Sequence, residues 1–540
     1  MMSRRCAMVS VAVFSSMTLS VLTPGDRPGL TSPAHAAGLA GMDGQGHSSV
    51  FVQNLDLSSI TRLGMTVYGR KDQVVGLSPR DLVAGGQYVY DFSLPGPPSG
   101  TYTAIASSDQ AISTIVRTEW PMTGGAIMSN ASLAGTDIVV PFAAKGYYGQ
   151  MSLISIQNSV TNTQATATLE FFTGDRTTPI AETSVTIAPG YAAYVDLGLS
   201  PDFATVPTGS VGYARVRSTT PVAVLSAVDF ERWANGVHAF EGLPAERASA
   251  RLFAPMVNAG PPPDFGGGGH FLNIPLPIIS IVNPGDETVE VRIRYDGVAG
   301  SCPGRIFHHP PFSLAGRTSV RIAPGPVKES VMDTGIDLLP AGCTASATIE
   351  ASGGGILATV VDTQLMDPTG LRGKVNAQSY NALTPDQGST MVLLPLIRRR
   401  YGDVNLTTAI QVMNLADQPA AVSIRFRDGQ GRLVEGCTGC AVMIRAGGGH
   451  LWWPADIPEL GDNLSGSALV TSDQPVGVVV NDISAIRAVD MASYVGIGVP
   501  SDLADGSWGR SFAPTVLAGN VSPSPTLAWR RYFPRLVLGP

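Results

Sequence analysis

Hydrophobic and polar residues alternate along much of this chain, and the alternation recurs in several similar stretches. In one of them Val289, Val291 and Ile293 are apolar, whereas the intervening Glu290 and Arg292 are charged. Residues i and i+2 of a β-strand face the same side of a sheet, so the pattern predicts strands with one buried and one solvated face. Residues 165–171 and 422–427 alternate in the same way. The sequence therefore predicts an all-β protein built from antiparallel sheets.

A short apolar segment that ends in Asn marks four stretches of the chain. The four residues, separated by 104, 125 and 131 positions, are Asn54, Asn158, Asn283 and Asn414. A turn, a second apolar segment and a Gly-containing corner follow each one, with the corners at Gly85, Gly190, Gly325 and Gly447. This period is the size of a domain, longer than a solenoid repeat. Because Asn tolerates left-handed backbone and bonds its own backbone, we expect the four Asn residues to shape turns.

The repeat and the N-terminal composition divide the chain into six segments. Arg4 and Arg5, an apolar run to about Leu22 and a small-residue site ending at Ala36 are typical of an export signal. The predicted segments are 1–36, the signal; 37–137, 138–250, 251–388 and 389–500, four β-sandwich domains; and 501–540, a C-terminal tail. Beyond the signal no run of about 20 apolar residues occurs, so we expect no transmembrane segment and a secreted or cell-surface protein.

Seven short strands fit between residues 139 and 227 of the second domain, with turn residues between them. The four domains resemble the Ig-like or fibronectin-like β-sandwich repeats of bacterial secreted and cell-surface proteins. The resemblance covers nearly all of the chain beyond the signal. It implies tandem antiparallel Ig-like β-sandwich domains, arranged as beads on a string with a core in each bead. Antibody-type domains also carry a Cys…Trp…Cys core, which this sequence lacks, so the strand order within each sandwich stays open.

A Pro-containing apolar string opens each of the last three domains, around Pro141, Pro255 and Pro395. Proline cannot donate to a neighbouring strand, so these strings are expected at a sheet edge or a bulge. The first domain has no obvious string of its own, but two further copies lie in the tail: Phe512, Pro514 and Val516, then Phe533, Pro534 and Leu536. We expect these to act as assembly strands that complete a sheet, within the chain or on the next molecule.

Four cysteines remain after the signal, and all lie in the third and fourth domains. Cys302 and Cys343 bracket the middle strands of the third domain, and a bridge between them would add ~4 kcal/mol of stability. Cys437 and Cys440 form a CxxC turn between strands that look antiparallel. Zinc needs four ligands and the chain has no second CxxC, so we expect a disulfide here too.

Composition and motifs narrow the possible functions. Only 14% of residues are charged and the net charge is -7, so we expect no nucleic-acid partner. The sequence has no nucleophile elbow, no HExxH pair and no P-loop, and we expect no enzyme, no cofactor and no resident metal. A calcium site assembled from separate strands stays open. Trp452 and Trp453 are adjacent on a strand, so one ring should point inward and the other could serve as a sugar-binding platform.

These observations together favour a non-enzymatic structural or adhesive protein outside the cell. Its partners would be further copies of itself, joined into a filament or sheath by tail-strand donation, or other cell-surface components. A carbohydrate-binding array with a glycan ligand is the alternative. An enzyme with a site built across domains would instead require convergent polar residues in a cleft between them.

Overall fold

The computed structural model is built from β-strands and a few 3₁₀ turns. It describes residues 7–12, 47–56, 58–69, 74–92, 100–120, 125–130, 132–230, 237–259, 274–325, 338–366, 376–429, 431–484, 491–499, 512–513 and 516–518. The strands pair in antiparallel sheets, apart from one parallel contact between β1 (Ala7–Ala12) and β34 (Phe512–Ala513). The expected all-β class with antiparallel sheets is confirmed.

The third unit shows the arrangement of one repeat most plainly. One of its sheets has the order β17-β23-β19-β20, with β21 also on β19, and the other has the order β22-β18-β24-β25. Alternate side chains of β19 are buried, as the sequence pattern predicts. The strands are β17 (Arg251–Ala259), β18 (Ile274–Asn283), β19 (Val289–Gly300), β20 (Ile306–His308), β21 (Phe312–Leu314), β22 (Thr318–Ile322), β23 (Cys343–Ala351), β24 (Ala358–Met366) and β25 (Asn376–Asn381).

The first unit repeats these pairings. Its sheets contain β6-β3-β4 and β5-β2-β7-β8. The C-terminal strand β35 (Val516–Ala518) also pairs with β6. The unit's own strands are β2 (His47–Asn54), β3 (Thr61–Gly69), β4 (Val74–Leu82), β5 (Gln87–Asp91), β6 (Gly100–Ser108), β7 (Ile112–Trp120) and β8 (Gly125–Asn130).

In the second and fourth units one long strand passes from the first sheet into the second. The two long strands are β14 (Ser210–Phe230) and β31 (Leu464–Ser484), and each joins the sheets of its unit into an 8-stranded system. The last two strands expected in the second unit therefore form one element. The other strands of the second unit are β9 (Gly135–Tyr147), β10 (Gln150–Asn158), β11 (Ala165–Thr173), β12 (Ala181–Ile187), β13 (Ala192–Asp196), β15 (Val237–Glu241) and β16 (Leu243–Pro244). Those of the fourth are β26 (Ser389–Arg399), β27 (Leu406–Asn414), β28 (Ala420–Arg427), β29 (Ala441–Ile444), β30 (Gly449–Trp452), β32 (Met491–Val495) and β33 (Ile497–Gly498).

The strand order within a unit differs from the immunoglobulin order. In the third unit the opening strand β17 pairs with β23, and β24 pairs with β18. Immunoglobulin sheets instead pair the first strand with the second and the sixth with the seventh. At this point the chain continues from one sheet into the other, through β14 and β31 in the second and fourth units and from β23 to β24 in the third, where an immunoglobulin domain would turn back in a hairpin.

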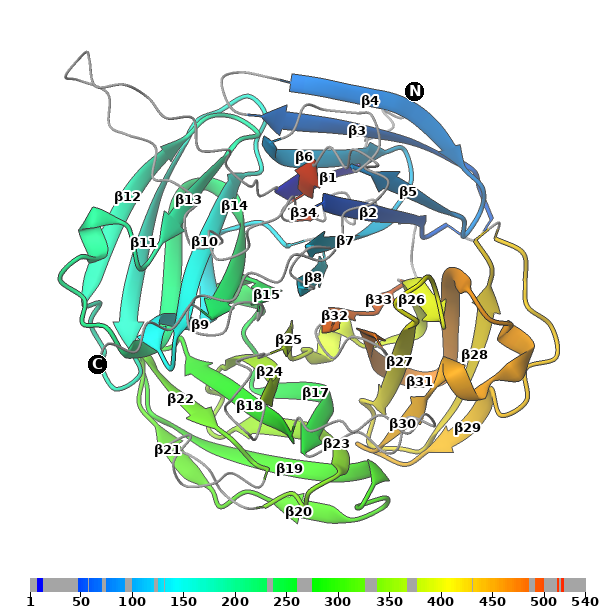
Figure 1. Cartoon of the computed structure of the whole chain (residues 1–540). Coiled ribbons are helices and arrows are strands. Elements are labelled where there is room, and N and C mark those ends of the chain that lie inside the picture. Colours follow the sequence, from blue (N-terminus) through cyan, green and yellow to red (C-terminus); the bar gives the residue numbers. More distant parts are fainter. Residues whose placement is uncertain are drawn as a thin grey trace, which may run out of the picture.

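The four units are arranged in a ring instead of a string (Figure 1). The inner strands of the units, β8, β15, β25 and β32, lie at its centre, and each contacts the two on either side of it. Hydrophobic clusters cross the boundaries between units. Phe51 and Met128 of the first unit pack with the core of the fourth, and Val282 of the third packs with Phe172 of the second. The expectation of separate beads is therefore wrong, because neighbouring units bury apolar surface against each other.

The four Asn residues hold the same turn in every unit. In each case the side-chain amide donates to the carbonyl four or five residues ahead, for example from Asn158 to Thr163 at 2.7 Å. It also lies within 3.5 Å of two consecutive carbonyls at the next corner, Ile187 and Ala188 in the second unit. Its oxygen accepts the N–H two residues ahead. Equivalent bonds occur at Asn54, Asn283 and Asn414. None of the four has left-handed backbone. The hydrogen bonds of the side chain, and not the backbone conformation, therefore account for Asn at this position.

The corner that follows supplies a contact to the preceding unit of the ring. A residue with positive φ occupies the same place in each corner: Gly85, Gly190, Arg317 and Gly447. In three units its carbonyl accepts a hydroxyl from the sixth strand of the preceding unit, through Thr103, Tyr213 and Ser346. The corner expected at Gly325 is thus displaced to residues 315–317 in the third unit, because Asn283 bonds the carbonyls of residues 314 and 315.

The Pro strings form bulges, as their sequence predicts. The register shifts between Ala254 and Val257 of β17, on either side of Pro255, and it shifts likewise around Pro141 and Pro395. The hydroxyl of Tyr380 on β25 bonds both the N–H and the carbonyl of Met256 at this bulge. Tyr494 makes the same pair of bonds to Leu396 in the fourth unit. The innermost strand therefore satisfies the backbone groups that the bulge leaves unpaired.

Candidate functional site at the centre of the ring

Four residues at the same position of the inner strands lie close to one another across unit boundaries. They are the last residues of β8, β15, β25 and β32: Asn130, Glu241, Asn381 and Val495. The amide of Asn130 donates to the Val495 carbonyl at 2.6 Å and accepts its N–H at 2.7 Å. Asn381 donates to the Glu241 carbonyl at 2.7 Å. Side-chain amides therefore replace backbone pairing between inner strands that belong to different sheets.

The carboxylate of Glu241 is the charged group of this layer. It accepts the Asn130 N–H, and the Asn381 amide lies 3.4 Å from its other oxygen. Only 9% of the residue is exposed, and burial raises the pKa of Glu241 to about 7. Hydrogen bonds to backbone N–H groups oppose this shift but do not cancel it. Glu241 therefore changes charge near neutral pH, at the point where three units meet.

A second charged cluster joins the first and fourth units. Asp482 on β31 accepts from Arg117 on β7 at 3.0 Å and from Arg398 on β26 at 2.8 Å. Arg117 also contacts Glu119. The Asp482 side chain is fully buried, and those of Arg117 and Arg398 are 2% and 8% exposed. Charges buried this deeply need partners, so the cluster holds the two units together in one register.

The second and third units share a cluster of residue types that occur in hydrolases. His238 Nδ1 lies 2.9 Å from Ser379 Oγ and 3.4 Å from Asp362 Oδ1. In a Ser-His-Asp triad the hydroxyl and the carboxylate lie on opposite ring nitrogens, whereas here both contact Nδ1. Ser379 also donates to the carbonyl of Ala239 at 3.1 Å, and His238 is 1% exposed. The geometry therefore fits a hydrogen bond between His238 and Ser379 that joins the two units, better than it fits Ser379 as a nucleophile activated by His238.

A buried arginine reinforces the same boundary. Arg321 on β22 of the third unit lies 4.6 Å from the ring centroid of Phe142 and 5.0 Å from that of Tyr147, both in the second unit. Burial lowers the pKa of Arg321 from its ordinary value. Cation–π contacts gain strength when they are desolvated, so this residue contributes to the attachment of the two units.

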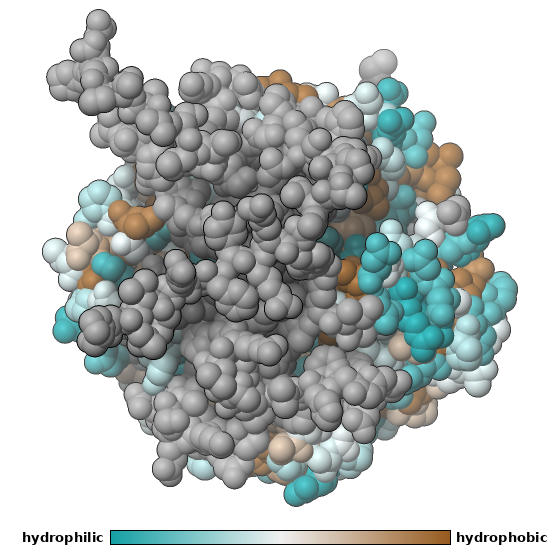
Figure 2. All heavy atoms as spheres, in the orientation of Figure 1, coloured by the Kyte–Doolittle hydropathy of each residue, from teal (hydrophilic) through white to brown (hydrophobic). Residues whose placement is uncertain are grey.

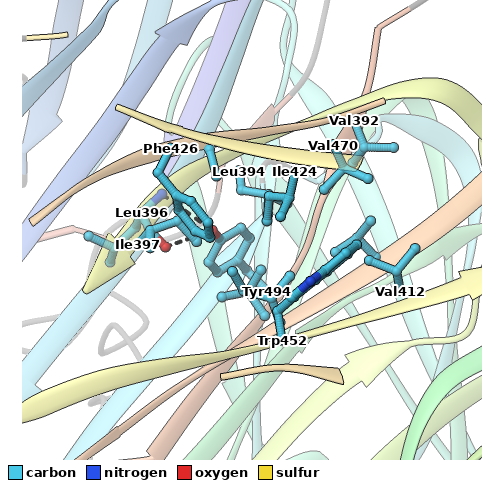
Figure 3. Packing of buried hydrophobic residues seen from close by; sticks show 14 of the residues in the cluster. Val392, Leu394, Leu396, Ile397, Val412, Ile424, Phe426, Trp452, Val470 and Tyr494 are labelled. Carbon is cyan, nitrogen blue, oxygen red and sulfur yellow. Dashed lines mark hydrogen bonds between the residues drawn. The ribbon is translucent and has the colours of Figure 1, made fainter. Parts of the chain in front are cut away.

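The expected sugar platform is largely occupied by the protein itself. Trp452 is 4% exposed and packs in the core of the fourth unit, where Figure 3 shows it beside Val412 and Tyr494. Its indole N–H donates to the Gly439 carbonyl at 3.0 Å. Trp453 is partly exposed and lies just beyond the end of β30, before a 3₁₀ turn. Trp453 alone remains as a candidate aromatic contact of this pair.

The cysteine pairs lie at disulfide distance, as expected. Cys302 and Cys343 have Cα atoms 5.2 Å apart, and those of Cys437 and Cys440 are 5.7 Å apart. Among the described residues, no three His, Cys, Asp or Glu side chains come together as a metal site would require. In the same part of the chain, no helix is long and apolar enough to cross a membrane.

The structure places part of the tail in the first unit. Phe512 lies in β34, which pairs with β1, and Val516 begins β35, which pairs with β6. These pairings are within one chain. Pro514, Phe533, Pro534 and Leu536 lie outside the described residues.

The charged residues of the central clusters were not expected from the sequence. Asp362 follows Val360 and Val361, and Asp482 comes two residues after the apolar run Val478-Val479-Val480; a charge next to such a run was the available signal. A charge in such a strand indicates a buried partner elsewhere. The partner could not be read from one chain segment, because Arg117 and Asp482 are 365 residues apart.

Comparisons with known proteins do not identify a family. No family model matches the chain, and no curated protein matches it. Among solved structures, the chain is similar to Thermotoga maritima 1070 with a TM-score of 0.17 and 12% identity, over 25% of this chain and 94% of that one. It is also similar to the native conformation of E. coli alpha-2-macroglobulin with a TM-score of 0.10 and 10% identity, over 84% of this chain and 29% of that one. Similarities of this size identify neither a fold nor a function.

Proposed function

We propose that this protein is an exported, non-enzymatic ring scaffold with a structural or adhesive role at the cell surface or outside the cell. The observation that carries the proposal is that the central polar side chains bond one another across unit boundaries. Arg117 with Asp482, and His238 with Ser379, each join two units.

Burial of these groups supports a structural role over a catalytic one. A general acid, base or nucleophile must reach a substrate atom, directly or through one water. Arg117, His238, Asp362 and Asp482 are at most 2% exposed. Each contacts a charged, hydroxyl or imidazole group of a neighbouring unit, an arrangement that suits the alignment of units around an axis.

Export is supported by the N-terminal signal pattern and by the two cysteine pairs. Disulfides persist mainly in oxidising compartments, which include the bacterial periplasm and the outside of the cell. A stable ring would suit this setting, because its repeated interfaces would present the rim in a fixed shape to other surface components.

The rim has a mixed character that suits weak or multiple contacts. Figure 2 shows hydrophilic and hydrophobic described residues interspersed around its edge. Exposed apolar side chains belong to different units, for example Val74 in the first, Leu199 in the second and Met443 in the fourth. Single exposed apolar residues are normal on soluble proteins. We therefore infer that binding partners would engage the rim largely through polar contacts.

Self-assembly into a filament is not part of the proposal, because the described tail strands pair within their own chain. Light scattering after size exclusion tests this point on residues 37–540. The expected result is the mass of one chain at every concentration. Species that grow with concentration would contradict a self-contained ring. Glycan binding that Trp453→Ala abolishes would favour the carbohydrate-binding alternative over a scaffold.

A further inference from the structure

We propose that loss of the N-terminal segment lets residues 511–518 take the place of β1 beside β6, so that the C-terminal tail supplies the opening strand of the first unit. The ring would then be closed by pairing between the C-terminal strand and β6 of the first unit. This inference rests on the expected removal of residues 1–36, and it is independent of the partner or role proposed above.

Among the described residues, the first unit has no opening strand from its own repeat. In the other three units the opening strands β9, β17 and β26 pair antiparallel with the sixth strand, which is β23 or the first part of β14 or β31. The sixth strand of the first unit is β6. One edge of β6 pairs with β3. The other edge, where an opening strand would lie, pairs with β1 at residues 103–108 and with β35 at residues 100–102. Segments from the two ends of the chain thus share the place beside β6 that an opening strand fills in the other units.

The register of β35 is the register of an opening strand. The first and third units align through their third strands, because Val67 pairs with Ala104 as Tyr295 pairs with Ala347. With this alignment Tyr102 corresponds to Ala345. Val516 pairs with Tyr102, and Val257 pairs with Ala345. Val516 therefore takes the register of Val257, and by sequence offset Phe512 and Ala513 correspond to Phe253 and Ala254.

The segment β1 occupies the rest of that position. Ser10 pairs with Ile105 and Val11 pairs with Ala104. On its other side, β1 pairs with the tail, so that Phe512 lies opposite Ser10 and Ala513 opposite Val11. The tail is therefore one strand away from β6, in the correct register. It also has the correct direction, because β34 is parallel to β1 and β1 is antiparallel to β6.

A shift of one strand spacing, about 4.8 Å, would complete the pairing. Phe512 would then face Ile105 and Ala513 would face Ala104, matching the third-unit pairs of Phe253 with Thr348 and Ala254 with Ala347. Pro514 and Thr515 would fall at the bulge, where Pro255 and Met256 lie in the third unit. The string would therefore carry its Pro at a bulge, where a missing N–H is tolerated.

The strand β35 contacts the facing sheet in the way that an opening strand does in the third unit. In the third unit β17 contacts β18 and β24 of the facing sheet. In the first unit β35 contacts β2 and β7, which are the corresponding strands. An exposed β6 edge would invite pairing with other chains, and exported proteins commonly cover such edges. Among the described strands, β34 pairs with β1 on the side away from β6, so it lies one strand from the edge that β1 would vacate.

Disulfide trapping tests the proposed register. Residues 37–540 with Ala104→Cys and Ala513→Cys carry thiols on facing residues, whereas Ala106→Cys with Ala513→Cys is two positions out of register. After mild oxidation, peptide mapping should show the first pair joined within one chain, at least fivefold more than the control pair. The uncleaved 1–540 chain, produced without export, should give at least fivefold less of the disulfide between positions 104 and 513, because Val11 faces Ala104 there.

Each other result would overturn the proposal. Equal trapping in the 37–540 and 1–540 chains would show that β1 does not hold the position. A link between two chains would show strand donation to a neighbour. Failure to trap in a variant that retains the melting temperature of the parent would show that the tail does not pair with β6. Because misfolding could also prevent trapping, the second measurement is the melting temperature of residues 37–510, which should rise when a peptide of residues 509–520 is added.

Discussion

At the scale of single residues, Glu241 is the group whose state depends most directly on its surroundings. Its three counterparts on the inner strands are Asn130, Asn381 and Val495, which carry no charge. A carboxylate in that layer accepts two amide donors but loses most of its hydration, and burial raises the pKa of Glu241 to about 7. Protonation therefore favours the folded ring, because burying the neutral carboxyl group costs less free energy than burying the carboxylate.

The sign of the resulting pH dependence follows from this shift. The folded pKa of about 7 lies above the ordinary value of 4.5, so the contribution of Glu241 is complete below pH 4.5 and is lost as the pH rises through 7. We expect the difference in unfolding free energy between wild type and Glu241→Gln to change by about 3 kcal/mol in favour of the variant between pH 4.5 and 8. Denaturant unfolding of both proteins across this pH range measures the change. Any effect of the substitution that does not depend on pH cancels, because only the change with pH is compared.

The exposed Glu182 on β12 provides the control. Glu182→Gln should leave the pH profile of wild type nearly unchanged. If Glu241→Gln and Glu182→Gln have the same profile, Glu241 titrates with an ordinary pKa and the buried layer does not govern stability near neutral pH.

At the scale of elements, the Asn turn is the feature that each repeat reproduces most closely. One side chain bonds the end of its own strand, the following loop and the next corner, for example at Asn158. Ala at this position would leave the carbonyls of Thr163 and Ile187 without that donor and would shorten a fully buried side chain. Asn→Ala in one unit should therefore cost more than the loss of a surface hydrogen bond.

For Asn158→Ala we expect the unfolding free energy to fall by about 3 kcal/mol, from two or three lost bonds of about 1 kcal/mol each and the desolvated groups left behind. Chemical denaturation gives the value. Asn162→Ala, in the exposed loop four residues later, is the matched change and should cost under about 0.5 kcal/mol. Equal losses in the two variants would mean that the buried amide does not hold the turn.

Much of the element structure was predictable from the chain, for identifiable reasons. Alternation located strands such as β19, and the missing N–H of Pro255 located a bulge. The corner of the third unit was misplaced because Arg317 adopts positive φ where the other units have Gly. That residue gives no sequence signal for left-handed backbone, whereas Pro324-Gly325 gives a misleading one.

At the scale of the whole molecule, the ring was not predictable from local patterns. The alternation predicts that each apolar face packs in the core of its own domain, yet Leu153 and Leu225 pack with the first unit and Val479 packs with the third. Charged and amide groups also have partners hundreds of residues away, as with Arg117 on β7 and Asp482 on β31, or Asn130 on β8 and Val495 on β32. A repeat period indicates how many units exist, but their mutual packing depends on pairs of faces that no single repeat contains.

The ring predicts a definite size in solution. A compact chain of residues 37–540 should have a radius of gyration of about 23 Å, from the usual scaling with chain length. Four separate domains end to end would give roughly twice that value, because each would add its own length to a rod. Small-angle X-ray scattering on a monodisperse sample distinguishes the two. The shared clusters and the repeated corner contacts to Thr103, Tyr213 and Ser346 predict the smaller value, independent of concentration. A radius near that of the rod would mean that the units separate in solution and that the central bonds do not hold the ring closed.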